Sequence, residues 1–366
     1  MSSSPQVPAP FVHRYADAGD FPPHQRAFAE VSQRVRSEGL LDRAPRFYWP
    51  LIAGLGAGLL ACAAASLLLR DSWFQLIVAG ALAIVLTQLA LIGHEAGHRQ
   101  VLRSGRANLR LARVLAGIVG LSFEWWDKKH TRHHGNPNRI GKDPDIAPGA
   151  ISFTSEDAAQ ARGVPRWIAK RQGWLFFPLL TLEGLNLHVS SLRHVISVRS
   201  SAHRKTELAL LLGRFAVLFA GAFLLMPQGM AVAFLAIQFA VFGVYMGASF
   251  APNHKGMPVI APTARLDFFS KQVRTSRNIR GGWWATALMG GLNYQVEHHL
   301  FPSMPRPHLA RARMLVREHC AVLGIPYTET SLWRSYGIVV RYLNRVGLAA
   351  RDPFECPVLA QYRGHR

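Results

Sequence analysis

Residues 73–98 read WFQLIVAGALAIVLTQLALIGHEAGH, an apolar run that ends in a pair of histidines. The uncharged part, residues 73–93, matches the roughly 20 residues that a helix needs to cross a bilayer. His94 and His98 stand four positions apart, so one helical face presents both imidazoles one turn from each other. Two imidazoles in this arrangement can share one metal ion. The stretch therefore predicts a membrane-spanning helix that ends in metal ligands.

Three other apolar runs have the same character, and short links join the four runs in pairs. Residues 70–72 and 227–229 are too short to be anything but tight turns, so each pair predicts a helical hairpin. Two further apolar segments are interrupted by charges or are too short to span: we expect residues 107–123 to be re-entrant or interfacial, and residues 175–187 to be interfacial. Residues 305–348 predict a pair of basic amphipathic helices.

The predicted fold class is an all-α integral membrane protein with four transmembrane helices in two hairpins and a cytosolic helical cap that carries the histidines. The expected organisation is an N-terminal arm with an amphipathic helix, hairpin 1, a cytosolic or interfacial region with the first two histidine motifs, hairpin 2, and a cytosolic C-terminal region with the third motif. These parts cover residues 1–46, 47–93, 94–207, 208–250 and 251–366.

Charge predicts the topology of these hairpins. The chain has 42 Lys and Arg residues against 21 Asp and Glu, and all but two of the basic residues lie outside the two hairpins. By the positive-inside rule, both termini and all histidine motifs face the cytosol, and we expect a multi-pass protein of a bacterial inner membrane. The same charge favours anionic lipid or a phosphorylated substrate, and we expect no nucleic-acid partner. Residues 1–10 lack the order of a signal peptide. The cysteines are too few and too scattered for a disulfide framework; they are Cys62, Cys320 and Cys356.

Two more histidine groups lie downstream of the first. His130, His133 and His134 stand at i, i+3 and i+4, so they share one helical face, and Gln295 with two following histidines repeats the spacing. Such imidazole clusters suit Zn, Cu or Fe rather than Mg or Ca. The grouped histidines are His94, His98, His130, His133, His134, His254, His298 and His299. Eight imidazoles on one predicted side favour two metal ions.

Other site classes fit part of this pattern. His94, Glu95 and His98 alone match the zinc metalloprotease motif, in which Glu95 would be the base, so an intramembrane protease is an alternative. A catalytic zinc needs about three protein ligands, and a haem carrier needs only two histidines. Either of these sites would therefore leave most of the eight grouped histidines without a role. Isolated histidines such as His188 and His203 are interpreted as satisfied polar residues.

The three motifs together resemble the histidine boxes of the membrane-bound fatty acid desaturases. They read GHEAGH at residues 93–98, KHTRHHGNPN at 129–138 and NYQVEHHLFP at 293–302. The third box, with Gln295 where many members have histidine, is similar to the branch of front-end and linoleoyl-CoA-type desaturases. The resemblance runs from about residue 47 to the C-terminal helices.

This resemblance implies a cytosolic di-iron centre that uses O2 and two electrons to introduce a double bond into an acyl chain, carried as acyl-CoA or acyl-lipid. It makes the seven box histidines iron ligands and places His254 where the family has an extra ligand. The chain contains no His-Pro-Gly-Gly motif of a fused cytochrome domain, so the electrons are expected from NAD(P)H through a separate ferredoxin- or cytochrome-type carrier with its reductase. A related di-iron hydroxylase or ketolase is the nearest alternative in mechanism.

Several residues beside the boxes are candidates for supporting roles. Weak ligands or residues that orient the imidazoles are expected among Gln295, Glu95, Asp127, Asn253 and Glu297. Asp143 and Asp145 are candidates for bonding a substrate headgroup or neighbouring loops. Four tryptophans are candidates for lining an acyl channel or for anchoring the protein at the bilayer interface; they are Trp125, Trp126, Trp283 and Trp284.

Overall fold

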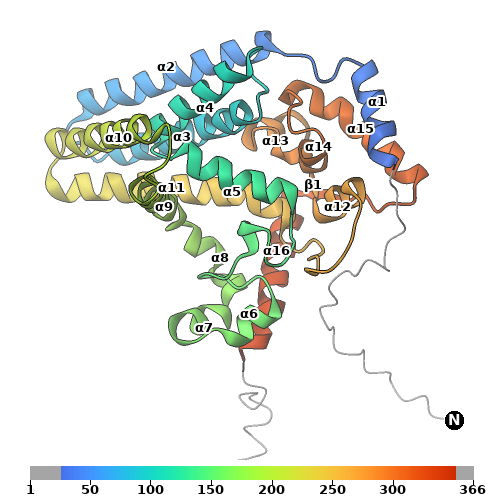
Figure 1. Ribbon diagram of the computed structural model, residues 1–366. Helices are drawn as coiled ribbons and strands as arrows, with labels where there is room; N and C mark the ends of the chain where they lie inside the picture. The colour runs from blue at the N-terminus through green and yellow to red at the C-terminus, as the bar shows by residue number, and fades with distance from the viewer. Residues whose placement is uncertain (1–25, 352–366) are drawn as a thin grey trace, which may run out of the picture.

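The computed structural model describes residues 26–351, which form a mostly helical molecule (Figure 1). The expectations for residues 1–10, for the first part of the N-terminal arm and for Cys356 lie outside the described residues. Within residues 26–351, four helices are long and apolar enough to cross a membrane, as the hydropathy pattern predicts. They are α2 (Pro45–Leu69), α3 (Gln75–Gly97), α10 (Arg204–Leu225) and α11 (Gln228–His254).

Helices α3 and α11 form the centre of this long-helix layer, because they pack along each other while α2 and α10 lie outside them. Half of the most apolar window of α3 is buried within the protein, whereas none of that of α2 is. A helix that is apolar all round and leaves most of one side uncovered is suited to contact with lipid. Both central helices end at histidines, α3 in the turn of His94 and α11 at His254.

Shorter helices lie beside this layer. Helices α8 and α9 are bent by 69° relative to each other, so this segment is a broken span or a re-entrant loop rather than a straight interfacial helix. The break packs closely on α11, where a Cβ at Gly243 would lie 2.3 Å from the backbone nitrogen of Gly184. Helix α4 is amphipathic and packs on α3. The bounds are α4 (Gly105–Val119), α5 (Phe123–Gly135), η2 (Pro144–Ile146), α6 (Ser155–Gln160), α7 (Gly163–Ala169), α8 (Gln172–Leu180) and α9 (Glu183–Ser197).

Elements α12 to α15 lie beside the histidine-bearing ends of α3 and α11, with α1 packed on α15, whereas α16 and η5 pack on α8 and α6 (Figure 1). Gly290 and Gly291 adopt φ values of +59° and +83°, and this left-handed turn leads the chain into the third box. The bounds are α1 (Ala27–Ser37), α12 (Phe268–Thr275), β1 (Asn278–Arg280), α13 (Gly282–Leu288), η3 (Leu292–Tyr294), α14 (Gln295–Leu300), η4 (Arg306–His308), α15 (Leu309–Val322), β2 (Glu329–Ser331), α16 (Leu332–Gly347) and η5 (Leu348–Ala350).

The all-α expectation is wrong in one respect, because β1 and β2 pair as a short parallel sheet. Its register places Ile279 opposite Thr330. Three residues in each strand give no period long enough to detect in the sequence. The C-terminal amphipathic pair is confirmed as α15 and α16, and α1 buries Val31 and Val35 as the arm's amphipathic pattern predicts.

Candidate metal centre

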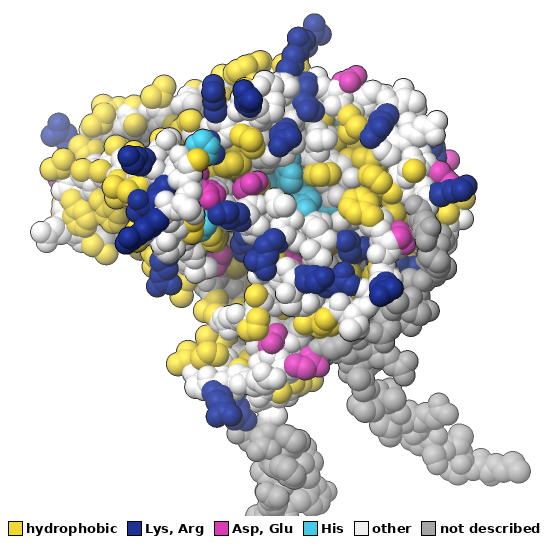
Figure 2. All heavy atoms as spheres, in the orientation of Figure 1, with side chains coloured by type: hydrophobic (Ala, Val, Ile, Leu, Met, Phe, Trp, Pro, Cys, Tyr) yellow, Lys and Arg dark blue, Asp and Glu magenta, His cyan; other side chains and the backbone are white. Residues whose placement is uncertain are grey.

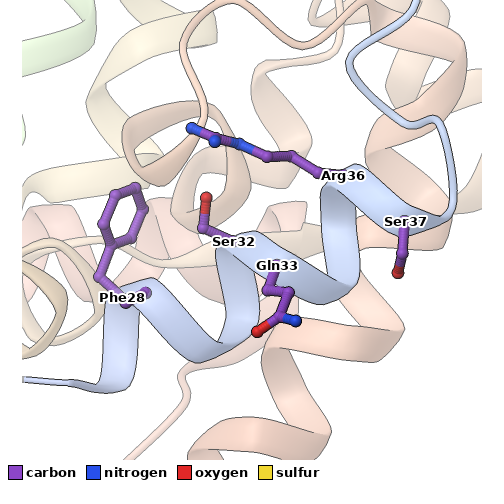
Figure 3. A pocket seen from close by; sticks show the side chains of 6 residues that line it. Phe28, Ser32, Gln33, Arg36 and Ser37 are labelled. Atoms are coloured by element: carbon purple, nitrogen blue, oxygen red, sulfur yellow. The ribbon is translucent and has the colours of Figure 1, made fainter.

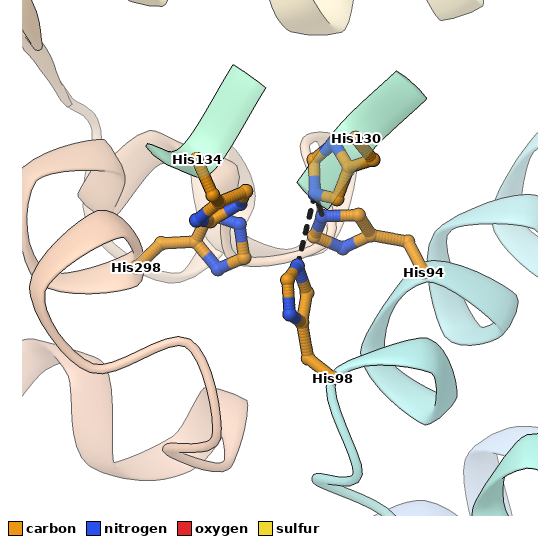
Figure 4. A group of neighbouring side chains, drawn as sticks. All are labelled: His94, His98, His130, His134 and His298. Carbon is orange, nitrogen blue, oxygen red and sulfur yellow. Dashed lines mark hydrogen bonds between the residues drawn. The ribbon is translucent and has the colours of Figure 1, made fainter. Parts of the chain in front are cut away.

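Five histidines from three elements converge to form the first cluster, which we call group 1 (Figure 4). Helix α3 and its C-cap supply two of them, α5 supplies two and α14 supplies one. The Nε2 atom of His130 lies 3.0 Å from that of His94 and 2.9 Å from that of His98. One ligand atom from each ring lies within 4.8 Å of the others. The members of group 1 are His94, His98, His130, His134 and His298.

Three fully buried histidines form the second cluster, group 2: His133, His254 and His299. The Nε2 atom of His254 lies 3.3 Å from that of His133 and 3.1 Å from that of His299. The two groups adjoin, since the rings of His134 and His299 stack with centroids 4.2 Å apart. All eight grouped histidines therefore meet at one place, as two neighbouring clusters.

The boxes divide between the groups in a way that spacing alone does not reveal. On α5, His130 and His134 enter group 1 while His133, at i+3, enters group 2. On α14, the adjacent His298 and His299 separate in the same manner. Box 1 contributes to group 1 alone, and His254 to group 2 alone. Two helices thus link both clusters, which favours a coupled pair of ions over two independent sites.

The geometry of these histidines fits metal ions. Two nitrogen ligands about 2.1 Å from one ion, at a right angle to each other, lie about 3.0 Å apart, which matches the separations between Nε2 atoms in both groups. Nε2 of His298 and both nitrogens of His134 are buried and have no hydrogen-bond partner within the described residues. Each ring can bind a metal ion through one nitrogen, and the ion would satisfy that atom.

The protonation states of the rings are suited to ligation. Burial lowers the pKa of His98 to about 4 and lowers the pKa values of His130, His134, His298 and His299 well below the ordinary range. These imidazoles are therefore neutral near pH 7. A neutral imidazole has a free lone pair, which metal binding requires.

Group 2 is held from outside by three oxygen atoms. Nδ1 of His133 donates to Asp143 at 3.0 Å, Nδ1 of His254 donates to the carbonyl of Thr275 at 2.9 Å, and Nδ1 of His299 donates to Oε1 of Gln272 at 3.0 Å. Each bond fixes the tautomer, so Nε2 of each ring carries the lone pair and faces the cluster. Asp143 thus bonds a box histidine. From the sequence, by contrast, Asp143 is expected to bond a substrate headgroup or a neighbouring loop.

The charge around His133 differs from that around the other rings. Burial lowers its pKa, but Asp145 and the hydrogen-bonded Asp143 offset this effect, and the net pKa is raised. Lys129 forms an ion pair with Asp145 at 2.9 Å. His133 is therefore the ring of group 2 that contacts carboxylates.

Gln295 and Asn253 complete the wall of group 2. The amide Nε2 of Gln295 donates to Nε2 of His254 at 2.9 Å, and its Oε1 accepts from Nδ2 of Asn253 at 3.0 Å. Gln295 therefore adjoins group 2 through its amide nitrogen, which donates to an imidazole. Asn253 contacts it from α11.

Among the described residues, two carboxylates next to box histidines form no hydrogen bond or ion pair with an imidazole, contrary to expectation. Glu95 forms a buried ion pair with Arg306 and accepts a hydrogen bond from Tyr48. Glu297 accepts hydrogen bonds of 2.7 Å from Asn278 and Tyr327, and burial raises its pKa to about 7. A helical residue adjacent to a ligand points away from it, so proximity in sequence was misleading here.

Asp127 also differs from its expected role. It is half-buried, burial raises its pKa, and it has no hydrogen bond to a box histidine within the described residues. Besides Asp143 and Gln295, Gln272 and Thr275 also bond the rings of group 2. They lie in α12, which has no histidine, so no sequence signal marks them.

The four tryptophans fall into different environments. Trp126 stacks on His130 with ring centroids 4.5 Å apart, whereas Trp125 lies near the ammonium of Lys129. Trp283 is 83% exposed and Trp284 is also exposed, as expected for side chains at a bilayer interface. Of the four, only Trp126 contacts the metal centre.

The two groups differ in their access to solvent. His98, His130 and His134 of group 1 are half-buried, whereas every member of group 2 is buried. Histidine atoms reach the molecular surface in Figure 2, among Lys, Arg and Asp or Glu side chains, while hydrophobic side chains gather over the long helices. Group 1 is therefore the side of the centre that faces the exterior.

A surface hollow on α1 is separate from this centre. Figure 3 shows Phe28, Ser32 and Arg36 on one side of the helix and Gln33 on another. The lining contains no histidine or carboxylate among the described residues. Its composition does not suit a metal ion.

The role of Asp143 can be tested through metal affinity. Replacing Asp143 with Asn leaves an amide group that cannot accept from both His133 and the backbone N–H of Asn138, which is bonded at 2.7 Å. We expect the affinity for the ion in group 2 to fall about 10- to 100-fold, measured by competition with a chromophoric chelator. Asp157→Asn, which alters a carboxylate bonded to Thr154 outside the centre, is the control. Unchanged affinity of both ions in Asp143→Asn would contradict the role.

Comparison with known proteins agrees with this geometry. A family model described as "Fatty acid desaturase" matches residues 71–331. The "Delta(8)-fatty-acid desaturase 2" of Arabidopsis thaliana is 28% identical over 90% of this chain and 75% of its own. The "Acyl-lipid (9-3)-desaturase" of Borago officinalis is 30% identical over 72% and 62%, and the "Delta(5) fatty acid desaturase fat-4" of Caenorhabditis elegans is 26% identical over 89% and 75%. The chain therefore belongs to the fatty acid desaturase family, and it is a membrane-associated oxidoreductase that acts on fatty acyl chains.

Proposed function

We propose that this protein is an O2-dependent acyl desaturase of the front-end type, in which groups 1 and 2 each hold one iron ion. The observation that carries the proposal is the meeting of eight neutral or carboxylate-paired imidazoles in two adjoining clusters. Removing two hydrogens from an unactivated acyl chain requires a metal oxidant, because no side chain supplies that chemistry. Iron provides this redox chemistry when it is bound, and zinc does not.

The chain's own residues prepare the site for this reaction. Asp143, Gln272 and the carbonyl of Thr275 hold the rings of group 2 in one orientation. Burial excludes water from group 2, which protects a reactive centre from side reactions. Trp126 packs on His130 at the more open group 1. The overall reaction consumes O2, two electrons and two protons, and it yields one double bond and two water molecules.

The proposed topology has two transmembrane hairpins, with both termini and the histidine centre in the cytosol of a bacterial cell. Short links between α2 and α3 and between α10 and α11 support the hairpins. The clustering of the ends of α3 and α11 at the histidines supports one common side for all boxes. The basic residues outside the hairpins support the cytosolic assignment. The exposed Trp167 and Trp174, next to Arg171, suit an interfacial position for α7 and α8.

Two features support the front-end branch. Gln295 occupies the first position of the third box, as in that branch, and it lies against His254 in group 2. Relatives named as delta-5 and delta-8 desaturases match most of the chain. We therefore propose that the substrate is an acyl-CoA or acyl-lipid in which the new double bond forms toward the carboxyl end.

The structure weighs against the intramembrane protease. The base of such a protease would be Glu95. This residue is instead 2% exposed, and Nε and Nη2 of Arg306 each donate a hydrogen bond to its carboxylate. A hydroxylase or ketolase would use the same centre, so product analysis separates it from a desaturase.

The decisive experiment is a fatty-acid profile, with double bonds located, of cells that express the chain. We expect unsaturated acids absent from cells that carry the empty vector and from cells that express His298→Ala. Hydroxylated or oxidised acids in place of new double bonds would favour the hydroxylase or ketolase. An unchanged lipid profile together with peptide cleavage would favour the protease.

A further inference from the structure

Arg306 and Glu95 form a bidentate ion pair in the interior of the protein. Nε of Arg306 donates to Oε1 of Glu95 at 3.0 Å, and Nη2 donates to Oε2 at 2.5 Å. Both side chains are 3% exposed. A planar guanidinium bound to both carboxylate oxygens fixes orientation as well as distance, which a lysine ammonium does not.

Other polar contacts extend this pair into what we call the polar seam, made by Tyr48, Glu95, Gln100, Arg306 and the carbonyl of Pro302. The hydroxyl of Tyr48 donates to Glu95 at 3.0 Å and accepts from the backbone N–H of Arg306 at 3.2 Å. Nε2 of Gln100 donates to the carbonyl of Pro302 at 2.7 Å. The seam joins the end of α3, which carries box 1, to the segment that follows box 3, and it anchors both to α2.

The position of the seam matters to one of the two groups. Group 1 requires His94 and His98 of box 1 to meet His298 of box 3, and their ring centroids lie 4.7 and 4.9 Å from that of His298. Group 2 takes no histidine from box 1. A shift of box 1 relative to the box 3 segment would therefore open group 1 and leave group 2 assembled.

We propose that Arg306 is a positioning residue that sets the distance between box 1 and box 3 and so assembles group 1. In the part of the chain that the structure describes, it forms no hydrogen bond with a box histidine, and it acts through Glu95, which follows His94 directly in the chain. The inference rests on the proposed function, because it assigns one metal ion to each group. It predicts a selective loss of one ion when the seam is broken.

The test compares the wild type with Arg306→Met, with the double variant Glu95→Gln/Arg306→Met, and with Arg313→Met. The double variant matters because Arg306→Met alone leaves a buried unpaired carboxylate, which destabilises the fold for reasons unrelated to positioning. Arg313→Met is the matched control, since it removes another bidentate pair, with Glu329 at 2.5 and 2.6 Å, that touches no box. Metal ions per chain, thermal unfolding and the amount inserted in membranes are measured for each.

We expect two ions per chain in the wild type and in Arg313→Met, and about one in the double variant, which still inserts and unfolds near the wild-type temperature. Adding His299→Ala to the double variant should remove the remaining ion, because that ion lies in group 2. Two ions in the double variant would overturn the inference, whatever number Arg306→Met alone retains. Fewer than two ions in the wild type would overturn the proposed function itself, and this inference with it.

Discussion

Replacing His130 with Ala is expected to reduce desaturation below detection while leaving the protein folded in the membrane. Nε2 of His130 lies 3.0 Å from Nε2 of His94 and 2.9 Å from Nε2 of His98, so it meets both box 1 rings within group 1. Loss of a ligand costs more than loss of the residue that orients it, which alone costs about 10- to 100-fold. Membrane insertion depends on the apolar length of the spans and is expected to remain. The measurement is the amount of new unsaturated acid per amount of membrane-inserted protein.

His203→Ala is the appropriate control for this variant. His203 is exposed at the start of α10 and belongs to neither group. His188 is a poorer control, because it is buried and its two ring nitrogens contact the carbonyls of Gly184 and Val119. Near-normal product from His130→Ala would mean that group 1 does not take part in the chemistry.

The spans and the histidine boxes were predictable because their signals are local. An uncharged run of about 20 residues in the 73–93 segment predicts a spanning helix whatever its neighbours are. The i, i+3 and i+4 spacing likewise predicts that His130, His133 and His134 project from one side of a helix. Local periodicity therefore predicts the helices that carry the histidines, but it does not predict which helices meet in the folded protein.

The division of the boxes between two groups depends on tertiary packing, which the spacing does not contain. His133 enters group 2 on the side of α5 where Asp143 bonds its ring and Gln272 of α12 bonds the carbonyl of His134. The same reasoning explains the misassigned carboxylates. Glu95 and Glu297 lie next to ligands in sequence, but helical geometry directs them into separate buried networks. They brace the elements that carry the histidines.

The second large effect expected is that purified protein given acyl-CoA and O2 is inactive until an electron carrier, its reductase and NADPH are added. Each turnover needs two electrons. The 366 residues contain three cysteines, fewer than the four thiolates that hold a [2Fe–2S] cluster of the ferredoxin type. Group 1 reaches the exterior through the half-buried His98 and His130, and the nearby Arg99, Lys128 and Arg132 are exposed. We expect an acidic one-electron carrier, of ferredoxin or cytochrome type, to dock here, since complementary charge speeds encounter.

The rate with limiting carrier should therefore fall as salt rises from about 0.1 M to 1 M, where the Debye length shrinks from about 10 Å to about 3 Å. Arg132→Glu should steepen the loss at low salt without changing the metal content, because Arg132 is exposed and is not a member of either group. Arg317→Glu, on α15 and also exposed, serves as the charge-matched control. Full turnover from NADPH with the purified chain alone would refute the need for a carrier. A rate that does not change with salt under limiting carrier would refute electrostatic docking. The need for the carrier would remain, because electron transfer would then depend on contact at group 1 and not on the basic residues around it.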